Sequence, residues 1–207
     1  MLARLLVAAT LFACSVTASA QQPVEGKDFF ELNPAHTTDA AGKIEVLEFF
    51  WYGCPHCHSL EPAIEAWLKK LPADVVFRRV PAVFNQNWET AARVHYTLDA
   101  MGQLDRLHKV FFDAIHNDNL RYTNQGQLDA WLTKNGIALD KYTTTSKSFT
   151  VESKVRRATQ LTSEYKFDGV PALVVQGRFV VGAQTSPVRQ LQNVDFFIAQ
   201  VRAEQKK

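Results

Sequence analysis

The sequence predicts an α/β protein in which a β-α-β unit is separated from a C-terminal hairpin and helix by a long all-helical segment. Three patterns support this fold class. Residues 44–52 form a nearly continuous apolar run, which is typical of a strand buried on both faces. Residues 85–165 show helical spacing of apolar residues and no strand signal. Strand character returns only at residues 172–181.

Residues 1–20 have the features of a secretory signal peptide. Arg4 gives a basic start, residues 5–13 form an apolar run, and Ala18-Ser19-Ala20 offers a small-residue cleavage site. The run is far shorter than the ~20 residues that a transmembrane helix needs. We therefore expect cleavage after Ala20 and export. The alternative is a lipoprotein signal at residues 11–14, which would leave an acylated Cys14 as a lipid anchor.

The remaining chain is nearly neutral and contains two cysteines. The full sequence has 23 Lys and Arg against 21 Asp and Glu, and Arg4 is the only charged residue before position 21. The exported part therefore has 22 basic residues, a net charge of +1, and no electrostatic footprint for nucleic acid. Because Cys14 leaves with the signal, only Cys54 and Cys57 remain, too few for a disulfide scaffold.

The first half of the exported chain predicts a β-α-β unit within residues 21–84. Residues 21–43 form a loose start with a short strand at 29–32, and the buried strand at 44–52 follows. After Gly53 the apolar residues recur with helical spacing, so a helix should begin near Cys54 and end before Pro72. A second strand at residues 75–80 completes the unit, whose crossover helix begins with the cysteine pair.

Residues 85–165 predict an inserted helical domain, and residues 166–207 return to the first domain. Helices are expected at 88–101, 104–116, 123–135 and 150–165. Two strands on either side of the Gln176-Gly177 turn predict a hairpin, and a final helix should run from Pro187 to about Arg202.

The sequence Cys54-Pro55-His56-Cys57, placed directly after a buried strand and at the start of a helix, indicates thiol chemistry. A helix N-terminus presents unpaired N–H groups and about half a positive charge, which favour thiolate over thiol. Cys54 is therefore the exposed candidate nucleophile, and Cys57, close to one turn later, can form a disulfide with it. Pro55 fits the first turn because it has no N–H, and a protonated His56 would stabilise the Cys54 anion further.

Two other positions are candidate site residues. Glu48 alternates with apolar neighbours on the strand and is either a buried carboxyl near Cys57 that handles its proton or a carboxylate at an exposed strand edge. Val170-Pro171 is either an ordinary strand opening or a cis peptide that leaves the Val170 backbone free to pair with an extended substrate.

Residues 46–50, the Cys54–Cys57 motif and Gly169-Val170-Pro171 together resemble the DsbA family of the thioredoxin superfamily, rather than thioredoxin itself, which has Gly-Pro between its cysteines. The resemblance implies a thioredoxin fold with an inserted all-helical domain. It places a cis Pro171 opposite the cysteines with Val170 beside it, and it supports the proton-handling role of Glu48. Pro62 matches the helix-kinking proline of thioredoxin.

The resemblance also implies a function. A periplasmic oxidase would donate a Cys54–Cys57 disulfide to reduced, newly exported polypeptides, with Val170, Pro171, Pro55 and His56 contacting the substrate. A quinone-linked membrane partner of the DsbB type would reoxidise the cysteines, so neither a cofactor nor a metal is expected. A monomeric oxidase is preferred over an isomerase of the DsbC type, whose N-terminal dimerisation domain would not fit in residues 21–43.

Four alternatives remain open from the sequence. An isomerase or reductase of the same superfamily is the first, because the direction of electron flow rests on a reduction potential that the sequence does not show. Cys54 to His58 also match the c-type haem pattern C-x-x-C-H, for which Met101 is the only thioether ligand after residue 20. A zinc site would need a distant histidine, and a non-catalytic binding module would make the disulfide incidental.

Several side chains receive an ordinary structural interpretation. The scattered histidines His36, His95, His108 and His116 are expected on the surface or on helix faces. The sequence does not decide whether Trp51, Tyr52, Phe84 and Trp88 belong to the core or to a peptide groove.

Overall fold

The computed structural model describes residues 22–183 and 186–206, which form one five-stranded mixed sheet and seven helices. The expected signal peptide at residues 1–20, and with it Cys14, lies outside the described residues. None of the helices within the described ranges combines the length and the apolar character needed to cross a membrane.

The sheet has the strand order β1-β5-β4-β2-β3, which confirms an α/β class with mixed strand directions. Strand β2 pairs in parallel with β3 and antiparallel with β4, while β5 pairs antiparallel with both β4 and β1. The strands are β1 (Phe30–Glu31), β2 (Ile44–Phe50), β3 (Val75–Pro81), β4 (Ala172–Val175) and β5 (Phe179–Val181).

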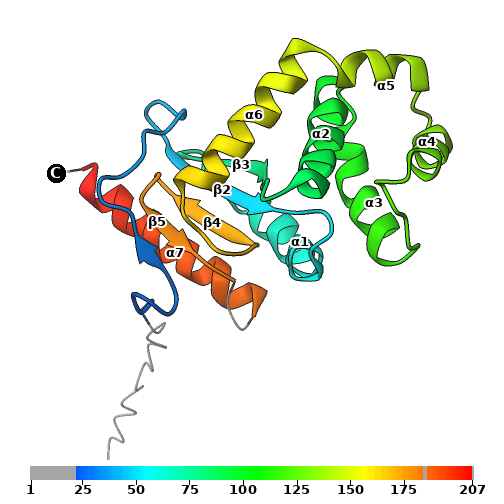
Figure 1. Cartoon of the computed structure of the whole chain (residues 1–207). Helices are drawn as coiled ribbons and strands as arrows, with labels where there is room; N and C mark the ends of the chain where they lie inside the picture. The colour runs from blue at the N-terminus through cyan, green and yellow to red at the C-terminus, as the bar shows by residue number, and fades with distance from the viewer. Residues whose placement is uncertain (1–21, 184–185, 207) are drawn as a thin grey trace, which may run out of the picture.

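The helices fall into two groups around this sheet (Figure 1). Helices α1 and α7 pack together and against one face, whereas α2 to α5 lie to one side and α6 leads back across the sheet. The helices are α1 (Pro55–Leu68), α2 (Gln86–Ala100), α3 (Leu104–His116), α4 (Gln125–Lys134), α5 (Leu139–Ser146), α6 (Phe149–Glu164) and α7 (Pro187–Glu204).

All seven residues of β2 are buried, because the strand separates two apolar cores. Ile44 and Val46 belong to the core under α1 and α7, and Leu47 and Phe49 belong to the larger core shared with the helices α2 to α6. The predicted double burial of this strand is therefore confirmed. Since β2 is central, the chain that leaves its end at Phe50 is held firmly where α1 begins.

The structure corrects several predicted boundaries and adds one helix. Strand β2 ends at Phe50 rather than at Tyr52, because Trp51 turns the chain and its carbonyl accepts a hydrogen bond from the Cys54 N–H at 2.9 Å. Helix α5 was not predicted from the sequence. It buries one side chain only, Tyr142, and its run of threonines has low helix propensity, so neither periodicity nor composition marks it.

The turn between β4 and β5 is fixed by Gly177, which has a φ of +62°. A Cβ at this position would lie 2.3 Å from the carbonyl oxygen of His36, whose N–H donates to the Gly177 carbonyl at 2.9 Å. We expect Gly177→Ala to lower the free energy of unfolding by more than about 2 kcal/mol, because left-handed strain of ~1 kcal/mol adds to a backbone clash. Urea unfolding measures this.

Gly42→Ala is the matched control. Gly42 has a similar φ of +71°, but open space surrounds its Cβ position, so only the backbone strain of ~1 kcal/mol applies. Equal losses of unfolding free energy in the two variants would show that the expected clash between the new Cβ and the His36 carbonyl adds no cost.

Candidate active site

Cys54 lies at the N-cap of α1, with Pro55 in the first turn of the helix. The Cys57 N–H donates to the Cys54 sulfur at 3.4 Å, and the His58 N–H bonds to the Cys54 carbonyl at 3.1 Å. A side chain at this position meets the positive end of the helix dipole. The predicted helix start is confirmed, and the nucleophile candidate sits where a thiolate is stabilised.

The two sulfurs lie in opposite environments. The pKa of Cys54 falls from its ordinary 9.0 to about 6, first because the Cys57 side chain hydrogen-bonds to it; burial opposes the fall, while N–H groups of the helix start and the nearby His56 add to it. Burial raises the pKa of Cys57 well above 9.0. Near neutral pH, Cys54 is therefore mostly thiolate and Cys57 stays a thiol.

Cys54 is less accessible than the sequence led us to expect. Only 7% of it is exposed, against none of Cys57, and the Val170 carbonyl lies 3.4 Å from its sulfur. The prediction of an exposed nucleophile was wrong in degree, although Cys54 is the more accessible of the pair. Pro55 and His56, one and two residues later, are exposed beside it.

The loop at Val170-Pro171 meets the cysteines across 116 residues of sequence. The Cys54 sulfur lies 3.4 Å from the Val170 carbonyl, to which it donates when it is protonated, and the peptide bond to Pro171 is cis, in agreement with the expectation. From α7, the buried amide of Gln190 donates to the Pro171 carbonyl at 3.1 Å. The structure thus brings Cys54, Cys57, His56, Val170 and Pro171 together.

Glu48 is completely buried, so the exposed-edge alternative is excluded. Its β3 neighbour in the parallel register is Arg79, whose Nε lies 3.3 Å from the Glu48 carboxyl. Burial, and next the charge of Glu61, raise the Glu48 pKa from 4.5 to about 8 against the opposing effect of Arg79. The charge of ionised Glu48 in turn raises the pKa of Cys57. A carboxyl that is protonated at pH 7 therefore stands behind the buried sulfur.

Sequence reasoning missed the partners of Glu48. Arg79 also contacts Glu61 and Glu65, both at 3.0 Å, and Glu61 in turn lies 3.2 Å from the Nε2 of His108. Burial would raise the pKa of Glu61, but His108 and Arg79 together lower it, so this carboxylate stays ionised. The available signal was an acidic residue four positions after Cys57, on the same face of the helix.

His95 and His108 lie on helix faces, as expected, but on the buried faces of α2 and α3. His95 and His108 are 2% and 5% exposed, and both ring Nδ1 atoms lie within hydrogen-bonding distance of the Tyr52 hydroxyl, at 3.1 Å and 2.7 Å. His36 and His116 are half-buried, as residues on helix faces and loops often are.

The four aromatic residues whose place the sequence left open are divided between the core and the surface. Tyr52 belongs to the core, whereas Phe84 is 47% exposed. Trp51, half-buried, stacks on Trp88 with ring centroids 4.5 Å apart.

The alternatives based on metal or haem gain no support. In the described ranges, no three side chains of His, Cys, Asp or Glu are grouped as metal ligands would be. His58, which completed the haem pattern, lies 2.8 Å from Asp113 through its Nε2 and stacks on His116.

Comparisons with known proteins agree with this site. The DSBA-like thioredoxin domain family matches residues 73–192. The chain is 40% identical over 210 residues to a thiol:disulfide interchange protein DsbA of Azotobacter vinelandii, covering 99% of this chain and 98% of that protein. A Pseudomonas aeruginosa relative of the same name is 36% identical over 208 residues, covering 100% and 98%.

Solved structures give the same result. The crystal structure of Pseudomonas aeruginosa DsbA aligns with a TM-score of 0.83 at 36% identity, covering 88% of this chain and 96% of that one. The oxidoreductase DsbA from Xylella fastidiosa aligns with a TM-score of 0.82 at 31% identity, covering 88% and 100%.

The difference between the two sulfurs predicts selective alkylation. We expect iodoacetamide to modify Cys54 of the reduced protein at a rate that rises with a midpoint near pH 6, the pKa of this thiol, while Cys57 stays unmodified at neutral pH. Mass spectrometry of the labelled peptide measures both rates.

A matched pair of variants tests the cause. Cys57→Ser keeps a donor to the Cys54 sulfur and should nearly preserve the midpoint, whereas Cys57→Ala removes it and should move the midpoint toward 9.0. Comparable labelling of both cysteines in the unmodified sequence would contradict the assignment of roles.

Proposed function

This chain belongs to the DsbA family of thiol:disulfide interchange proteins, and from that premise we propose that it works as an oxidase that donates its Cys54–Cys57 disulfide to reduced, newly exported proteins. The observation that carries the direction of transfer is the contrast between the two sulfurs. A Cys54 pKa of about 6 stabilises the reduced protein, so the disulfide is readily given away.

The reaction begins when a substrate thiolate attacks the Cys54 sulfur. A bond forms between the substrate and Cys54, the Cys54–Cys57 bond breaks, and Cys57 leaves with the electron pair. Because Cys57 is buried and its pKa is raised, it takes up a proton, and we assign the role of proton donor to Glu48, which is protonated at neutral pH and acts electrostatically on Cys57. A second substrate thiol then displaces Cys54 and releases the oxidised substrate.

Substrate binding is assigned to the surface around Cys54. Pro55 and His56 are exposed on one side of the sulfur, and Val170-Pro171 approaches it on the other. An extended peptide that pairs with the backbone at Val170 would lie across the sulfur. His56 has a second role there, since its charge favours the thiolate that forms when the substrate leaves.

We infer the cellular setting from the sequence. Cleavage after Ala20 would deliver the protein to the periplasm, where a quinone-linked partner of the DsbB type would reoxidise Cys54 and Cys57. The protein would act as a monomer, with residues 85–165 as a helical domain inserted between 21–84 and 166–207.

Substitution of each cysteine tests the assignment. The oxidised wild type should introduce disulfides into a reduced, unfolded model protein, and Cys54→Ser should abolish this activity because no attackable sulfur remains. Cys57→Ser cannot form the internal disulfide and should lose the activity as well. Given a disulfide-bonded substrate, its Cys54 thiolate should attack that disulfide, release one substrate thiol and accumulate a mixed disulfide, visible on non-reducing gels, because Cys57 is no longer present to displace the substrate.

The direction of electron flow is decided by the reduction potential measured against glutathione. A potential well above that of glutathione supports an oxidase, whereas a potential at or below it would assign the chain to the reductases or isomerases of the same superfamily.

The lowered Cys54 pKa also predicts how stability depends on pH. A folded pKa of about 6 against 9.0 gives stabilisation that is fully present above pH 9 and lost as the pH falls through about 6. The reduced protein should gain about 1 kcal/mol from this source at pH 7 and about 3 kcal/mol at pH 8.5. The short disulfide loop stabilises the oxidised form by ~2 kcal/mol, independently of pH.

Urea unfolding of both redox forms should therefore show nearly equal stability at pH 7 and a more stable reduced form at pH 8.5. Reduced Cys54→Ser is the control, since it should lack this pH dependence. An oxidised form that remains the more stable one throughout this range would contradict the proposed origin of oxidising power.

A further inference from the structure

A continuous chain of buried hydrogen bonds runs from Glu61 of α1, four residues after Cys57, to His95 of α2, which lines a cavity beside β3. It consists of Glu61, His108, Tyr52 and His95, linked by distances of 3.2, 2.7 and 3.1 Å. These four side chains come from α1, α3, the β2–α1 loop and α2, and each is at most 5% exposed. The disulfide chemistry described above makes no use of Tyr52 or of the two histidines.

The order of donors along this chain follows from hydrogen-bond accounting. Glu61 is ionised and can only accept, so the Nε2 of His108 carries a hydrogen. Burial lowers the pKa of His108, so the ring is neutral and its Nδ1 accepts from the Tyr52 hydroxyl. The Tyr52 oxygen then accepts from the Nδ1–H of His95. All donors therefore point toward Glu61.

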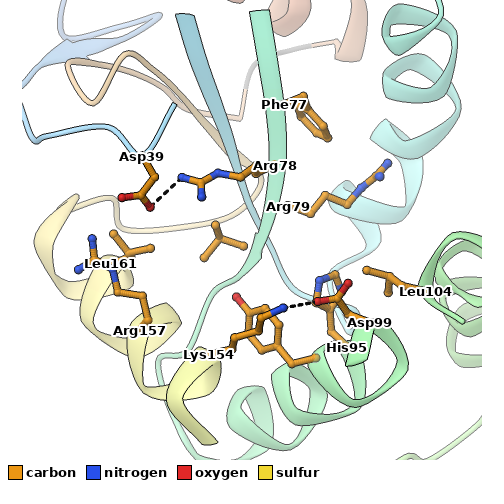
Figure 2. Close-up of a pocket in the computed structure, with 12 residues that line it drawn as sticks. Asp39, Phe77, Arg78, Arg79, His95, Asp99, Leu104, Lys154, Arg157 and Leu161 are labelled. Carbon is orange, nitrogen blue, oxygen red and sulfur yellow. Dashed lines mark hydrogen bonds and ion pairs between the residues drawn. The ribbon is translucent and has the colours of Figure 1, made fainter. Parts of the chain in front are cut away.

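The outer end of the chain reaches a cavity of about 400 Å³ between β3, α2 and α6. Figure 2 shows His95 among the residues that line it. The rim carries exposed side chains, since 64% of the Asp39 side chain and 45% of the Lys154 side chain are accessible. Neither cysteine lines this cavity, so it is not the substrate site.

The inner end lies at the carboxyl cluster behind Cys57. Glu61 is four residues after Cys57 on the same helix, and it shares the guanidinium of Arg79 with Glu48. Glu48 is completely buried and has no direct access to solvent. A proton that Glu48 gives to Cys57 must therefore be replaced through other groups.

We propose that His95, Tyr52 and His108 form a proton path that connects the cavity bounded by β3, α2 and α6 with the buried carboxyl groups behind Cys57. This inference rests on the proposed function, because it supplies the proton that the leaving Cys57 requires.

The transfer is balanced along the chain. A proton from solvent binds the Nε2 of His95, whose Nδ1 proton passes to Tyr52. The Tyr52 hydroxyl proton passes to the Nδ1 of His108, and the Nε2 proton of His108 passes to Glu61. In the last step of the proposed path Glu61 gives its proton to Glu48, the carboxyl with which it shares Arg79, and becomes ionised again. One proton enters, one reaches the carboxyl cluster, and no electrons change place.

Charged and titratable groups from every neighbouring element act on His95, the entry point. Its own helix contributes Tyr96, whose ring contacts the imidazole, while Asp99 of that helix lines the same cavity. The other groups that act on it are His108 of α3, Arg79 of β3 and Lys154 of α6. Burial first, and then the neighbouring His108, Arg79 and Lys154, lower the pKa of His95. His95 therefore carries the proton only transiently, as a relay requires, rather than storing it.

The test measures proton uptake by Glu48 directly. The reduced protein is jumped from about pH 9.5 to about pH 6.5, across the Glu48 pKa of about 8, and the C=O stretch of the protonated carboxyl is followed by time-resolved infrared absorption. Glu48→Gln identifies the band. We expect Tyr52→Phe to slow its appearance at least about tenfold while the final amplitude stays the same.

A second variant separates a relay from a structural role. His95→Ala should slow the uptake to a similar degree, and added imidazole should restore the rate because the empty site adjoins the cavity. Tyr142→Phe, at a buried tyrosine of α5 outside the chain, should behave as wild type. If Tyr52→Phe does not fold, the imidazole dependence of His95→Ala decides.

Unchanged uptake rates in Tyr52→Phe and His95→Ala would overturn the proton path, and so would a slow His95→Ala rate that imidazole does not restore. Because the infrared signal does not depend on disulfide exchange, these outcomes are distinct from a failure of the proposed oxidase. An inactive oxidase with normal proton uptake through the chain would reject the function and leave the path in place.

Discussion

The structure depends on one constraint, which is that two sulfurs three residues apart must occupy opposite environments. The N-terminus of α1 meets this constraint. Cys54 lies at the N-cap, beside unpaired N–H groups, whereas Cys57, in the first helical turn, points into the core. This works only if the helix start is fixed in space. The buried strand β2 provides the fixed point, since it ends at Phe50 and the Cys54 N–H is bonded to the carbonyl of Trp51.

A buried sulfur that changes its protonation state requires a polar group nearby, and burying such groups is costly unless they are paired. The parallel register of β2 and β3 pairs Glu48 with Arg79, and α1 contributes Glu61 to the same guanidinium. Two carboxyl groups around one cation cannot both be ionised easily in the interior. The better hydrogen-bonded Glu61 keeps its charge, and Glu48 is held protonated at neutral pH.

The sequence was sufficient for the parts of the structure that depend on local pattern. The apolar run of β2, the helix that begins at the cysteines and the spacing of α3 were all visible in the chain, because periodicity reflects burial directly. Long-range polar partners were not visible in the same way. Whether His108 lies in the core or at the surface depends on the packing of α3 against α1, which the spacing of apolar residues does not specify.

The stabilisation of the Cys54 thiolate and the protonation of Glu48 therefore depend on different parts of the chain. The influences that stabilise the Cys54 thiolate come from residues 56 and 57 of α1, so this sulfur depends on one helix turn. The protonation of Glu48 depends instead on β3 through Arg79 and on α1 through Glu61, whose ionised state is held by His108 of α3. The helices between β3 and β4 thus do more than cover the sheet. Their docking sets the acid behind Cys57, so a change in the packing of α3 alters proton transfer while the nucleophile keeps its properties.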